Sequence, residues 1–228
     1  MTVTLITGAN KGLGFETARQ LIARGHTVYV GARDLERGEA AAAALGGRFV
    51  QLDVTDDASV EIALGVIGER EGRLDVLVNN AGVSVWGDVT GPVASQVFDT
   101  NVIGVIRVTQ AALPLLEQSE NSVVVNVSSA LGSFWAVTNP ERRQFQFPSI
   151  VYGSSKAAVS MITVQYAKTY PGIKFNAVEP GFTATELTPF SDAGQPVELG
   201  AEVIVRMATI GEDGPTGTFW EGEHELRW

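Results

Sequence analysis

The stretch Thr7-Gly8-Ala9-Asn10-Lys11-Gly12-Leu13-Gly14 decides the fold, because it joins a short apolar run to a helical pattern. The run before it is apolar and β-branched, and the residues after it repeat apolar side chains at helical spacing. Glycines in such a turn let the backbone approach a ligand closely, and the helix N-terminus offers free N–H groups to a pyrophosphate. The stretch therefore predicts a dinucleotide-binding turn, the alternative being a turn whose glycines serve helix packing only. A P-loop is excluded, because Gly-Lys-Ser or Gly-Lys-Thr is missing at its end.

Short apolar runs alternate with helical patterns from residue 3 almost to the end of the chain. The expected strands are Val3 to Thr7, Thr27 to Gly31, Arg48 to Val54, Val76 to Asn79, Ser122 to Val127, Lys174 to Val178 and Thr218 to Trp220. The expected helices are Leu13 to Arg24, Leu35 to Leu45, Ser59 to Arg70, Ala94 to Gln118, Tyr152 to Tyr170 and Glu198 to Met207. This alternation predicts an α/β fold, namely a single Rossmann-type doubly wound parallel sheet flanked by helices on both faces. Because no linker interrupts the pattern, we expect residues 1–228 to form a single dinucleotide-binding and catalytic domain.

Two irregular segments interrupt the alternation. An insertion near residues 134–149 contains Pro140 and Pro148, and a loop near residues 186–197 contains Pro189 and Pro196. Ligands of open α/β sheets bind outside the carboxyl ends of the strands, and both segments follow strands. We therefore expect the insertion to lie beside the active site and the second segment to act as a lid.

The composition excludes several classes of protein. The 228 residues are 45% hydrophobic, enough for a sizeable core, and the net charge of -10 repels the phosphate backbone of a nucleic acid. No run of about 20 apolar residues is present, so we expect no membrane span. The chain has no cysteine and only two histidines, His26 and His224, so we expect no metal site. Met1 leads straight into an apolar strand without a basic signal region, which favours the cytoplasm.

The end of the second expected strand selects between NADPH and NADH. An acid there would bind the ribose 2′-hydroxyl of NADH, whereas an arginine accommodates the 2′-phosphate of NADPH. Arg33 and Asp34 occupy this place, and Asp34 follows Gly14 by 20 residues (34 minus 14), as in an NAD-binding chain. Asp34 also precedes an expected helix and fits its N-cap. We therefore expect NADPH to be preferred over NADH, with Arg33 and Lys11 sharing the phosphate. The alternative is that Arg33 is only a surface charge.

Tyr152 and Lys156 are four residues apart in an expected helix, which places both side chains on one face. A tyrosine with a pKa near ~10 is a poor acid–base group at neutral pH unless a nearby cation stabilises its phenolate. Lys156 and the positive end of the helix would supply that charge. A packed tyrosine beside an unrelated lysine would show the same spacing, so other motifs must decide.

Those other motifs occur in a fixed order along the chain. They are Thr7 to Gly14, Asn79-Asn80-Ala81-Gly82, Asn101, Asn126-Val127-Ser128-Ser129, Tyr152 to Lys156 and Pro180-Gly181. With these motifs the sequence resembles the short-chain dehydrogenase/reductase family from residue 3 to the end. Lys11, Arg33 and the segment from Pro215 to Trp220 are most similar to its NADPH-dependent carbonyl reductase branch.

The resemblance implies a role for each matching residue. Tyr152 would donate a proton to the substrate carbonyl oxygen, or accept it in the reverse direction, and Ser129 would hydrogen-bond the same oxygen. Lys156 would hold the nicotinamide ribose and lower the pKa of Tyr152. Asn101 would anchor a water that links the lysine to solvent. Two alternatives stay open: Ser128 in place of Ser129, and an Asn101 that only caps or kinks its helix.

The resemblance also implies a cofactor-binding set. The segment from Asn79 to Gly82 would wall the cofactor. Pro180, Gly181 and Thr185 would lie by the nicotinamide carboxamide, and Asp53 would contact the adenine or cap a helix. The full expected set is Gly8, Asn10, Lys11, Gly12, Leu13, Gly14, Arg33, Asp53, Val54, Asn80, Ala81, Gly82, Tyr152, Lys156, Pro180, Gly181, Thr183 and Thr185.

The insertion departs from the family pattern. Ser129 and Tyr152 are 23 positions apart (152 minus 129), which is wider than the ordinary family spacing. Relatives with a longer insertion here tend to be monomers, because it covers the helices that others use to associate. The intermediate length of this insertion decides neither for a monomer nor for a homo-oligomer.

Aromatic residues in and near the insertion suggest the kind of substrate. The expected substrate-binding residues are Ser129, Trp135, Tyr152 and Trp86, and the expected substrate is a small carbonyl compound of apolar or aromatic character. Aromatics in such a loop equally often anchor it to the body of the protein.

The sequence thus predicts an NADPH-dependent oxidoreductase of the carbonyl reductase type, which transfers a hydride to a ketone or aldehyde. One alternative is an NAD-linked alcohol dehydrogenase working oxidatively, which Asp34 would favour. Another is a non-catalytic dinucleotide-sensing regulator, although such proteins usually lack the tyrosine or the lysine.

Overall fold

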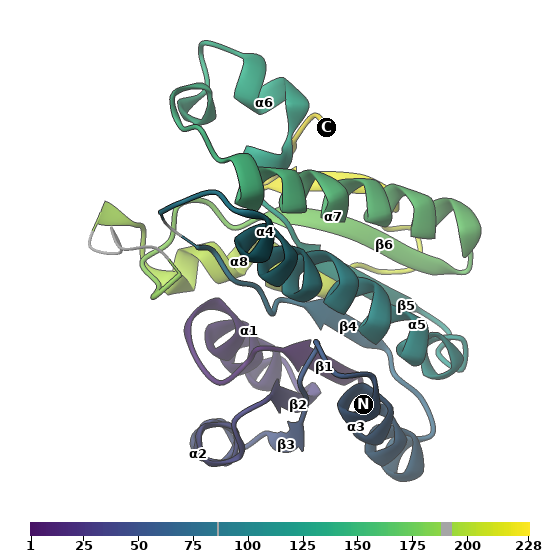
Figure 1. Cartoon of the computed structure of the whole chain (residues 1–228). Coiled ribbons are helices and arrows are strands. Elements are labelled where there is room, and N and C mark those ends of the chain that lie inside the picture. Colours follow the sequence, from purple (N-terminus) through teal and green to yellow (C-terminus); the bar gives the residue numbers. More distant parts are fainter. Residues whose placement is uncertain (86, 188–192) are drawn as a thin grey trace.

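A central sheet runs through the molecule. The computed structural model describes residues 1–85, 87–187 and 193–228. The strand order is β3-β2-β1-β4-β5-β6-β7-β8 (Figure 1). The strands are β1 (Val3–Thr7), β2 (Thr27–Ala32), β3 (Arg48–Gln51), β4 (Val76–Asn79), β5 (Ser122–Val127), β6 (Ile173–Glu179), β7 (Thr218–Glu221) and β8 (His224–Glu225). Neighbours from β3 to β7 run parallel, and β8 runs antiparallel to β7. This is the Rossmann-type doubly wound sheet that the alternating pattern predicts, with its change of direction between β1 and β4.

Helices cover both faces of the sheet (Figure 1). They are α1 (Gly12–Ala23), α2 (Leu35–Leu45), α3 (Asp57–Glu71), α4 (Gly91–Phe98), α5 (Gly104–Leu116), α6 (Phe134–Thr138), α7 (Ile150–Thr169) and α8 (Val197–Ala208). On one face α1 packs on α2 and α8, and on the other α3 packs on α5 and α4 on α7. Leu5 belongs to the core layer of α3 and α5, and its neighbour Ile6 to the layer of α1 and α8. Consecutive apolar residues are needed because both faces are covered.

The structure corrects several predicted boundaries. β3 ends at Gln51 rather than at Val54. The predicted helix from Ala94 to Gln118 consists of α4, a π-helical turn η1 (Asp99–Ile103) and α5. The short antiparallel β8 was not predicted. The insertion, predicted to be irregular, contains α6 and a short 3-10 helix η3 (Arg143–Gln146).

The carboxyl ends of the parallel strands gather the motifs at one edge of the sheet. The glycine turn follows β1, and the segment beginning at Asn79 ends β4. Ser129 follows β5, and Pro180 follows β6. Because β1, β4, β5 and β6 are direct neighbours in this order, four segments that are far apart in sequence become adjacent.

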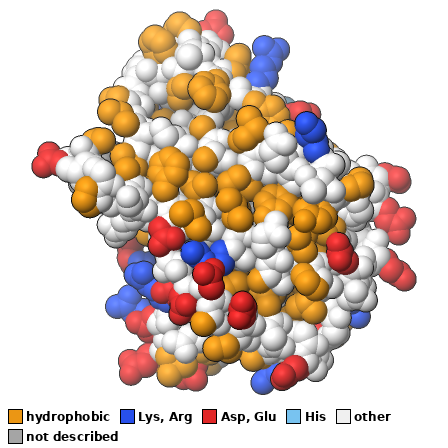
Figure 2. All heavy atoms as spheres, turned by 45° about the vertical axis from the view of Figure 1, so that its right-hand side comes forward, with side chains coloured by type: hydrophobic (Ala, Val, Ile, Leu, Met, Phe, Trp, Pro, Cys, Tyr) orange, Lys and Arg blue, Asp and Glu red, His pale blue; other side chains and the backbone are white. Residues whose placement is uncertain are grey.

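The outer face of α5 and α7 is partly apolar. Ile106, Ile150 and Met161 are exposed there, and Figure 2 shows hydrophobic surface interrupted by charged side chains over this side of the molecule. Sedimentation or light scattering is the measurement that would reveal self-association through it. Within residues 1–85, 87–187 and 193–228, every helix falls short of the length and hydropathy that a membrane span requires.

Candidate active site

The glycine turn forms a cradle for a diphosphate. Gly8 and Gly12 have φ angles of 65° and 56°, a left-handed conformation that favours glycine. A Cβ atom on Gly14 would come within 2.5 Å of the Asn80 Nδ2 and 2.6 Å of the Gly8 carbonyl oxygen. At the start of α1, the described residues provide no side-chain hydrogen bond from Lys11 to the first-turn N–H groups. Those groups are therefore free for an anion, and the cradle fits the pyrophosphate of a dinucleotide.

Asn80 and Thr7 join the end of β4 to this cradle. The Asn80 Nδ2 donates to the carbonyl oxygens of Thr7 at 2.9 Å and Gly8 at 3.1 Å. In return the Thr7 hydroxyl accepts from the backbone N–H groups of Asn80 at 3.0 Å and Ala81 at 2.9 Å. Hydrogen bonds in both directions therefore join the segment after β4, which is expected to line the cofactor site, to the glycine turn. Leu13, by contrast, packs its side chain into the core beside α8, which leaves its backbone for the cofactor.

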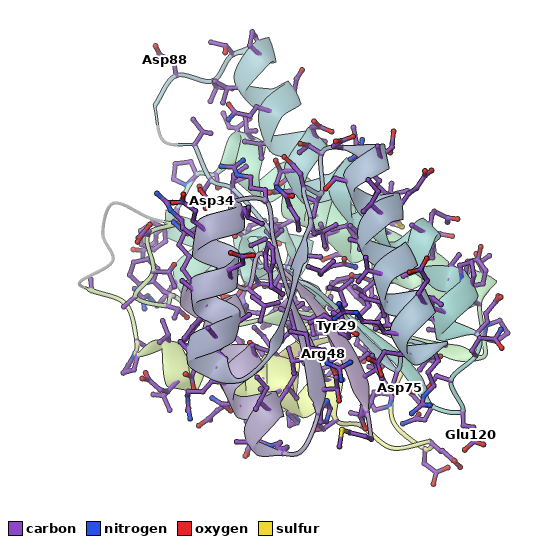
Figure 3. The ribbon with its side chains drawn as sticks, turned by 90° about the horizontal axis from the view of Figure 1, so that it is seen from below. Tyr29, Asp34, Arg48, Asp75, Asp88 and Glu120 are labelled. Atoms are coloured by element: carbon purple, nitrogen blue, oxygen red, sulfur yellow. The ribbon has the colours of Figure 1, made fainter. Side chains whose placement is uncertain are left out.

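Asp34 acts as a helix cap in the structure. Its carboxylate accepts from the Arg37 backbone N–H at 3.0 Å, and it lies at the N-terminal end of α2 (Figure 3). It also pairs with the Arg37 guanidinium at 3.8 Å. Arg33 is exposed beside it, and Lys11 forms an exposed ion pair with Glu186 from the loop after β6. The two cations expected to share a 2′-phosphate are thus on the surface, and Asp34 already has donors.

Asp53 folds its carboxylate back onto the chain. It accepts from the Thr55 backbone N–H at 2.9 Å and from the Thr55 hydroxyl at 2.7 Å. Burial alone would raise the pKa of Asp53, but these bonds and the nearby Arg33 outweigh it and lower that pKa. The cap of α3 is Asp56 and not Asp53. The carbonyl of the next residue, Val54, accepts from the Arg107 guanidinium at 2.6 Å. Hydrogen bonds thus hold both Asp53 and Val54 in the segment that follows β3.

The turn after β6 is held by Gln195. The Gln195 Nε2 donates to the Pro180 carbonyl at 2.5 Å, and Gly181 has a φ of 78°. The Thr183 hydroxyl donates to the Gly181 carbonyl at 3.1 Å. A Cβ on Gly12 would lie 3.5 Å from the Thr185 methyl, which places this loop against the glycine turn. Part of the predicted lid, residues 188–192, lies outside the described residues.

Tyr152 and Lys156 lie together at the start of α7. The Lys156 Nζ lies 5.5 Å from the centre of the Tyr152 ring and donates to the Val127 carbonyl at the end of β5 at 2.7 Å. Lys156 is 4% exposed. Gly132 allows this arrangement, because a Cβ there would come within 2.5 Å of the α7 backbone. The expected pair therefore meets at the carboxyl edge of the sheet.

Ser129 and not Ser128 faces the tyrosine. The Ser128 hydroxyl is buried against α7, where it donates to the Lys156 carbonyl at 3.0 Å and lies 3.2 Å from the Ser160 hydroxyl. Ser129 is partly exposed and hydrogen-bonds Tyr152. This arrangement favours Ser129 over Ser128 as the serine beside the tyrosine.

Asn101 sits in the π-helical turn between α4 and α5. Its Oδ1 accepts from the Val83 N–H at 2.8 Å, and its Nδ2 donates to the Val83 carbonyl at 2.9 Å and the Ser155 hydroxyl at 3.1 Å. A Cβ on Gly82 would lie 3.4 Å from the Asn101 Oδ1 and 3.7 Å from the Lys156 Nζ. Asn101 is therefore a near neighbour of Lys156, and π-helical turns recur at functional sites.

Burial sets the proton affinities of the pair. It raises the pKa of Tyr152 well above its usual range, the charge of Glu179 raises that pKa further, and the hydrogen bond with Ser129 opposes the rise. Burial lowers the pKa of Lys156 from 10.5 to about 8, with Glu179 acting in the opposite direction. Lys156 is not among the groups that shift the Tyr152 pKa here, so the lowering expected from it is not seen in this structure. At neutral pH the phenol keeps its proton.

Glu179 is a site residue that the sequence reasoning missed. It ends β6, is 7% exposed, and accepts from the backbone N–H groups of Ala130 and, at 3.1 Å, Gly181. Burial raises its pKa, against the hydrogen bonds from Ala130, Ser129 and Gly181. An acid closing an apolar strand, directly before Pro-Gly, is the signal that could have revealed it.

Trp135 packs away from this group. Its ring lies 5.6 Å from the guanidinium carbons of both Arg142 and Arg227, and the Trp135 backbone N–H donates to the Trp228 carbonyl at 3.1 Å. It packs on a small core cluster that includes Phe219. These contacts favour the loop-anchor alternative over substrate contact. Trp86, also expected to touch substrate, lies outside the described residues.

A comparison with known families agrees with this geometry. A family model described as short chain dehydrogenase matches residues 2–195. The chain belongs to this family. As a short-chain dehydrogenase it is an NAD(P)-dependent oxidoreductase, and the glycine cradle, Tyr152 and Lys156 stand where the motifs predict them.

Relatives cover nearly the whole of this short-chain dehydrogenase. A short-chain dehydrogenase/reductase of Stachybotrys chlorohalonatus is 36% identical over 248 residues, covering 96% of this chain and 87% of the relative. The (-)-isopiperitenone reductase of Mentha piperita is 33% identical over 304 residues, covering 97% and 96%. The structure of an NADPH-bound carbonyl reductase from chicken fatty liver aligns with a TM-score of 0.87 at 27% identity, covering 100% of both chains.

Proposed function

We propose that this short-chain dehydrogenase is an NADPH-dependent carbonyl reductase in which Tyr152 is the acid. The observation that carries the proposal is the meeting of Ser129, Tyr152 and Lys156 at the end of β5, where Lys156 is held by the Val127 carbonyl beside the Tyr152 ring. A protonated phenol suits reduction, because the carbonyl oxygen needs a proton as it gains negative charge.

The residues divide the chemistry as follows. The bound cofactor supplies a hydride to the carbonyl carbon. The Ser129 hydroxyl has one proton, which in the structure is directed to Tyr152 and Glu179, and with substrate bound it is donated instead to the carbonyl oxygen. Tyr152 transfers its phenolic proton to that oxygen to give the alcohol. Lys156, held by the Val127 carbonyl, keeps a positive charge beside the phenolate that remains. Asn101 braces the segment after β4 against α7.

The preference for NADPH is supported by the end of β2. The Asp34 carboxylate accepts a hydrogen bond from the first turn of α2, which leaves it poorly placed to accept one from a ribose hydroxyl. Arg33 is exposed, and among the described residues Lys11 pairs with the exposed Glu186. A phosphate with nearly two charges would compete well for both cations. The oxidative alternative needs Asp34 as a ligand and therefore has less support.

An apolar cyclic ketone is the proposed substrate class. The name of the Mentha relative contains isopiperitenone, and Phe145 and Phe147 of the insertion are half exposed. Exposed aromatic rings of this kind offer apolar contact area at a small cost in conformational entropy.

Calorimetric titration with NADPH and with NADH tests the cofactor part. We expect NADPH to bind at least about tenfold more tightly, since each exposed ion pair contributes up to about 1 kcal/mol. A Lys11→Met variant should lose part of this preference, and Arg24→Met, at the far end of α1, should keep it. Equal affinity for the two cofactors would rule out the phosphate role of Lys11 and Arg33.

A panel of ketones and aldehydes, followed by NADPH absorbance, tests the reaction. Isopiperitenone and linear aldehydes of similar size should be compared, and the cyclic ketone should have the higher kcat/KM. Absence of turnover on every member of the panel, despite NADPH binding, would contradict the proposed reaction.

A further inference from the structure

Glu179 connects two turns of the site. Its carboxylate accepts from the backbone N–H of Ala130, directly after Ser129, and from that of Gly181 at 3.1 Å. β5 and β6 are paired up to Val127 and Val178, so Glu179 stands opposite the serine turn where the ladder ends. One buried side chain thus fixes the turn that carries Ser129 and the turn that follows β6.

The charged neighbours of Glu179 come from α7 and β7. On α7, the charge of Glu179 raises the pKa of both Lys156 and Tyr152. Glu221 is its register partner on β7. The charge of Glu221 is in turn taken up by Arg142 of the insertion, whose guanidinium reaches both carboxylate oxygens at 2.6 and 2.7 Å.

A buried carboxylate without a bonded cation is costly. Within the described part of the chain, Glu179 receives hydrogen bonds from backbone N–H groups and Ser129, and forms no ion pair at salt-bridge distance. Burial raises its pKa, and the neighbouring Glu221 adds to that rise. The two Glu179 carboxylate oxygens accept from two different backbone N–H groups, which a glutamine, with one amide oxygen, could not do. The acid at this position is therefore suited to holding both turns at once.

We propose that Glu179 is a positioning residue, which holds the Ser129 turn and the Pro180-Gly181 turn in one arrangement and presents a negative charge to Lys156 and Tyr152. The inference rests on the proposed function, because its effect is read in carbonyl reduction. The negative charge helps Lys156 to keep its proton, and a charged Lys156 stabilises the phenolate that Tyr152 leaves after proton transfer. Arg142 pairs with Glu221, the register partner of Glu179, and so weakens the second negative charge beside the site.

Two substitutions separate geometry from charge. Glu179→Gln keeps the length of the side chain, removes its charge and leaves only one oxygen to accept from the Ala130 and Gly181 N–H groups. Glu179→Asp keeps the charge but withdraws the carboxylate from the two N–H groups. The readouts are kcat for carbonyl reduction and the pH at which kcat falls on the alkaline side. Glu202→Gln, an exposed change on α8, is the matched control, and titration with 2′,5′-ADP measures the folded fraction of each protein independently of activity.

Both Glu179 variants should lose kcat by about tenfold to hundredfold, as small displacements of reacting groups do. Glu179→Gln should also move the alkaline fall in kcat to lower pH, because Lys156 loses the charge that raises its pKa. Glu179→Asp should leave that fall where the wild type has it. If Glu179→Gln does not fold, the kcat of Glu179→Asp still decides the positioning role.

Wild-type kcat and an unmoved pH profile in both variants would overturn the proposal. So would a loss of kcat no larger than the loss of folded protein in the 2′,5′-ADP titration. A wild-type enzyme that reduces no carbonyl compound would instead overturn the proposed function itself, which makes the two failures distinguishable.

Discussion

Two carboxylates at opposite ends of the sheet, the partly buried Asp75 and the buried Glu179, have opposite environments. Asp75 precedes β4 at the amino end (Figure 3), where its oxygens accept from the Val3 N–H at 2.6 Å, the Arg73 Nε at 3.0 Å and the Ser119 hydroxyl at 2.7 Å. Burial would raise the pKa of Asp75, but these donors outweigh it and lower the pKa. At the carboxyl end, burial wins and raises the pKa of Glu179.

The difference lies in the cation. Asp75 has a bonded guanidinium, so its charge is neutralised and stabilises the fold. Glu179 has backbone donors and a serine, so its charge remains to act on Lys156 and Tyr152. The comparison teaches that substitutions at the carboxyl end should change the rate, and substitutions at the amino end should change the stability.

The largest effect is expected for Tyr152→Phe. Loss of the acid should lower kcat about 10³-fold to 10⁴-fold, within the upper range for a general acid, while NADPH binding and the melting temperature stay close to wild type. Steady-state kinetics, calorimetry and a thermal melt check the three quantities. Turnover close to wild type would remove Tyr152 from the mechanism.

Asp75→Asn should show the reverse pattern. The variant keeps the shape but leaves Arg73 without its carboxylate, and the free energy of unfolding should fall by about 2 kcal/mol. The folded-state pKa of Asp75 is lowered, so its stabilisation is present above its ordinary value of 3.8 and disappears as the pH falls through the lower folded value. In urea unfolding, the free energy of unfolding of the variant should therefore differ most from that of the wild type at pH values well above 3.8. The difference should shrink as the pH falls below that value. The kcat of Asp75→Asn should be unchanged. A large drop in kcat would contradict the expectation that substitutions at the amino end of the sheet affect stability and not rate.

The rate of carbonyl reduction should fall with rising pH as Lys156 loses its proton. Burial lowers the pKa of Lys156 to about 8, so the charged form is depleted as the pH rises through that value. The rate should then decrease by up to about tenfold per pH unit, as expected for one required proton. Lys156→Arg keeps the charge throughout and should lack this fall, whatever its kcat. A wild-type rate that stays constant well above pH 8 would show that the charge of Lys156 is not required.

The smallest effect is expected for Glu186→Gln. This exposed carboxylate pairs with Lys11, and its removal should free the ammonium for a phosphate and tighten NADPH binding by about twofold to fivefold. Binding of NADH should change little, and the advantage should shrink at high salt. Calorimetry at two salt concentrations measures both, and Glu198→Gln on α8 is a suitable control.

Much of the fold follows from local patterns, and the deviations have local causes. The end of β3 was misplaced because Asp53 bonds to Thr55, which turns the chain before Val54. The π-helical turn at Asn101 does not change the pattern of apolar residues, so the sequence predicts one continuous helix there. β8 has two polar residues, His224 and Glu225, and exists only through its pairing with β7.

The site was predicted where motifs exist and missed where they do not. The glycine turn, Ser129, Tyr152 and Lys156 lie in motifs whose spacing and order are informative. Glu179 has no partner at a fixed spacing, and its importance depends on the burial and neighbours that β6 acquires in the sheet. Trp135 shows the same limit, because a sequence does not reveal whether a loop aromatic faces a pocket or two arginines.

The small strand β8 has a consequence for the behaviour of the protein at high concentration. A sheet that ended at β7 would offer a parallel edge on which another chain could add a strand. β8 instead turns back after Gly222, pairs at only two positions, and exposes the side chains of His224 and Glu225. A charged, two-residue edge is a poor template for strand addition, so we expect this side of the molecule to resist fibrillar aggregation.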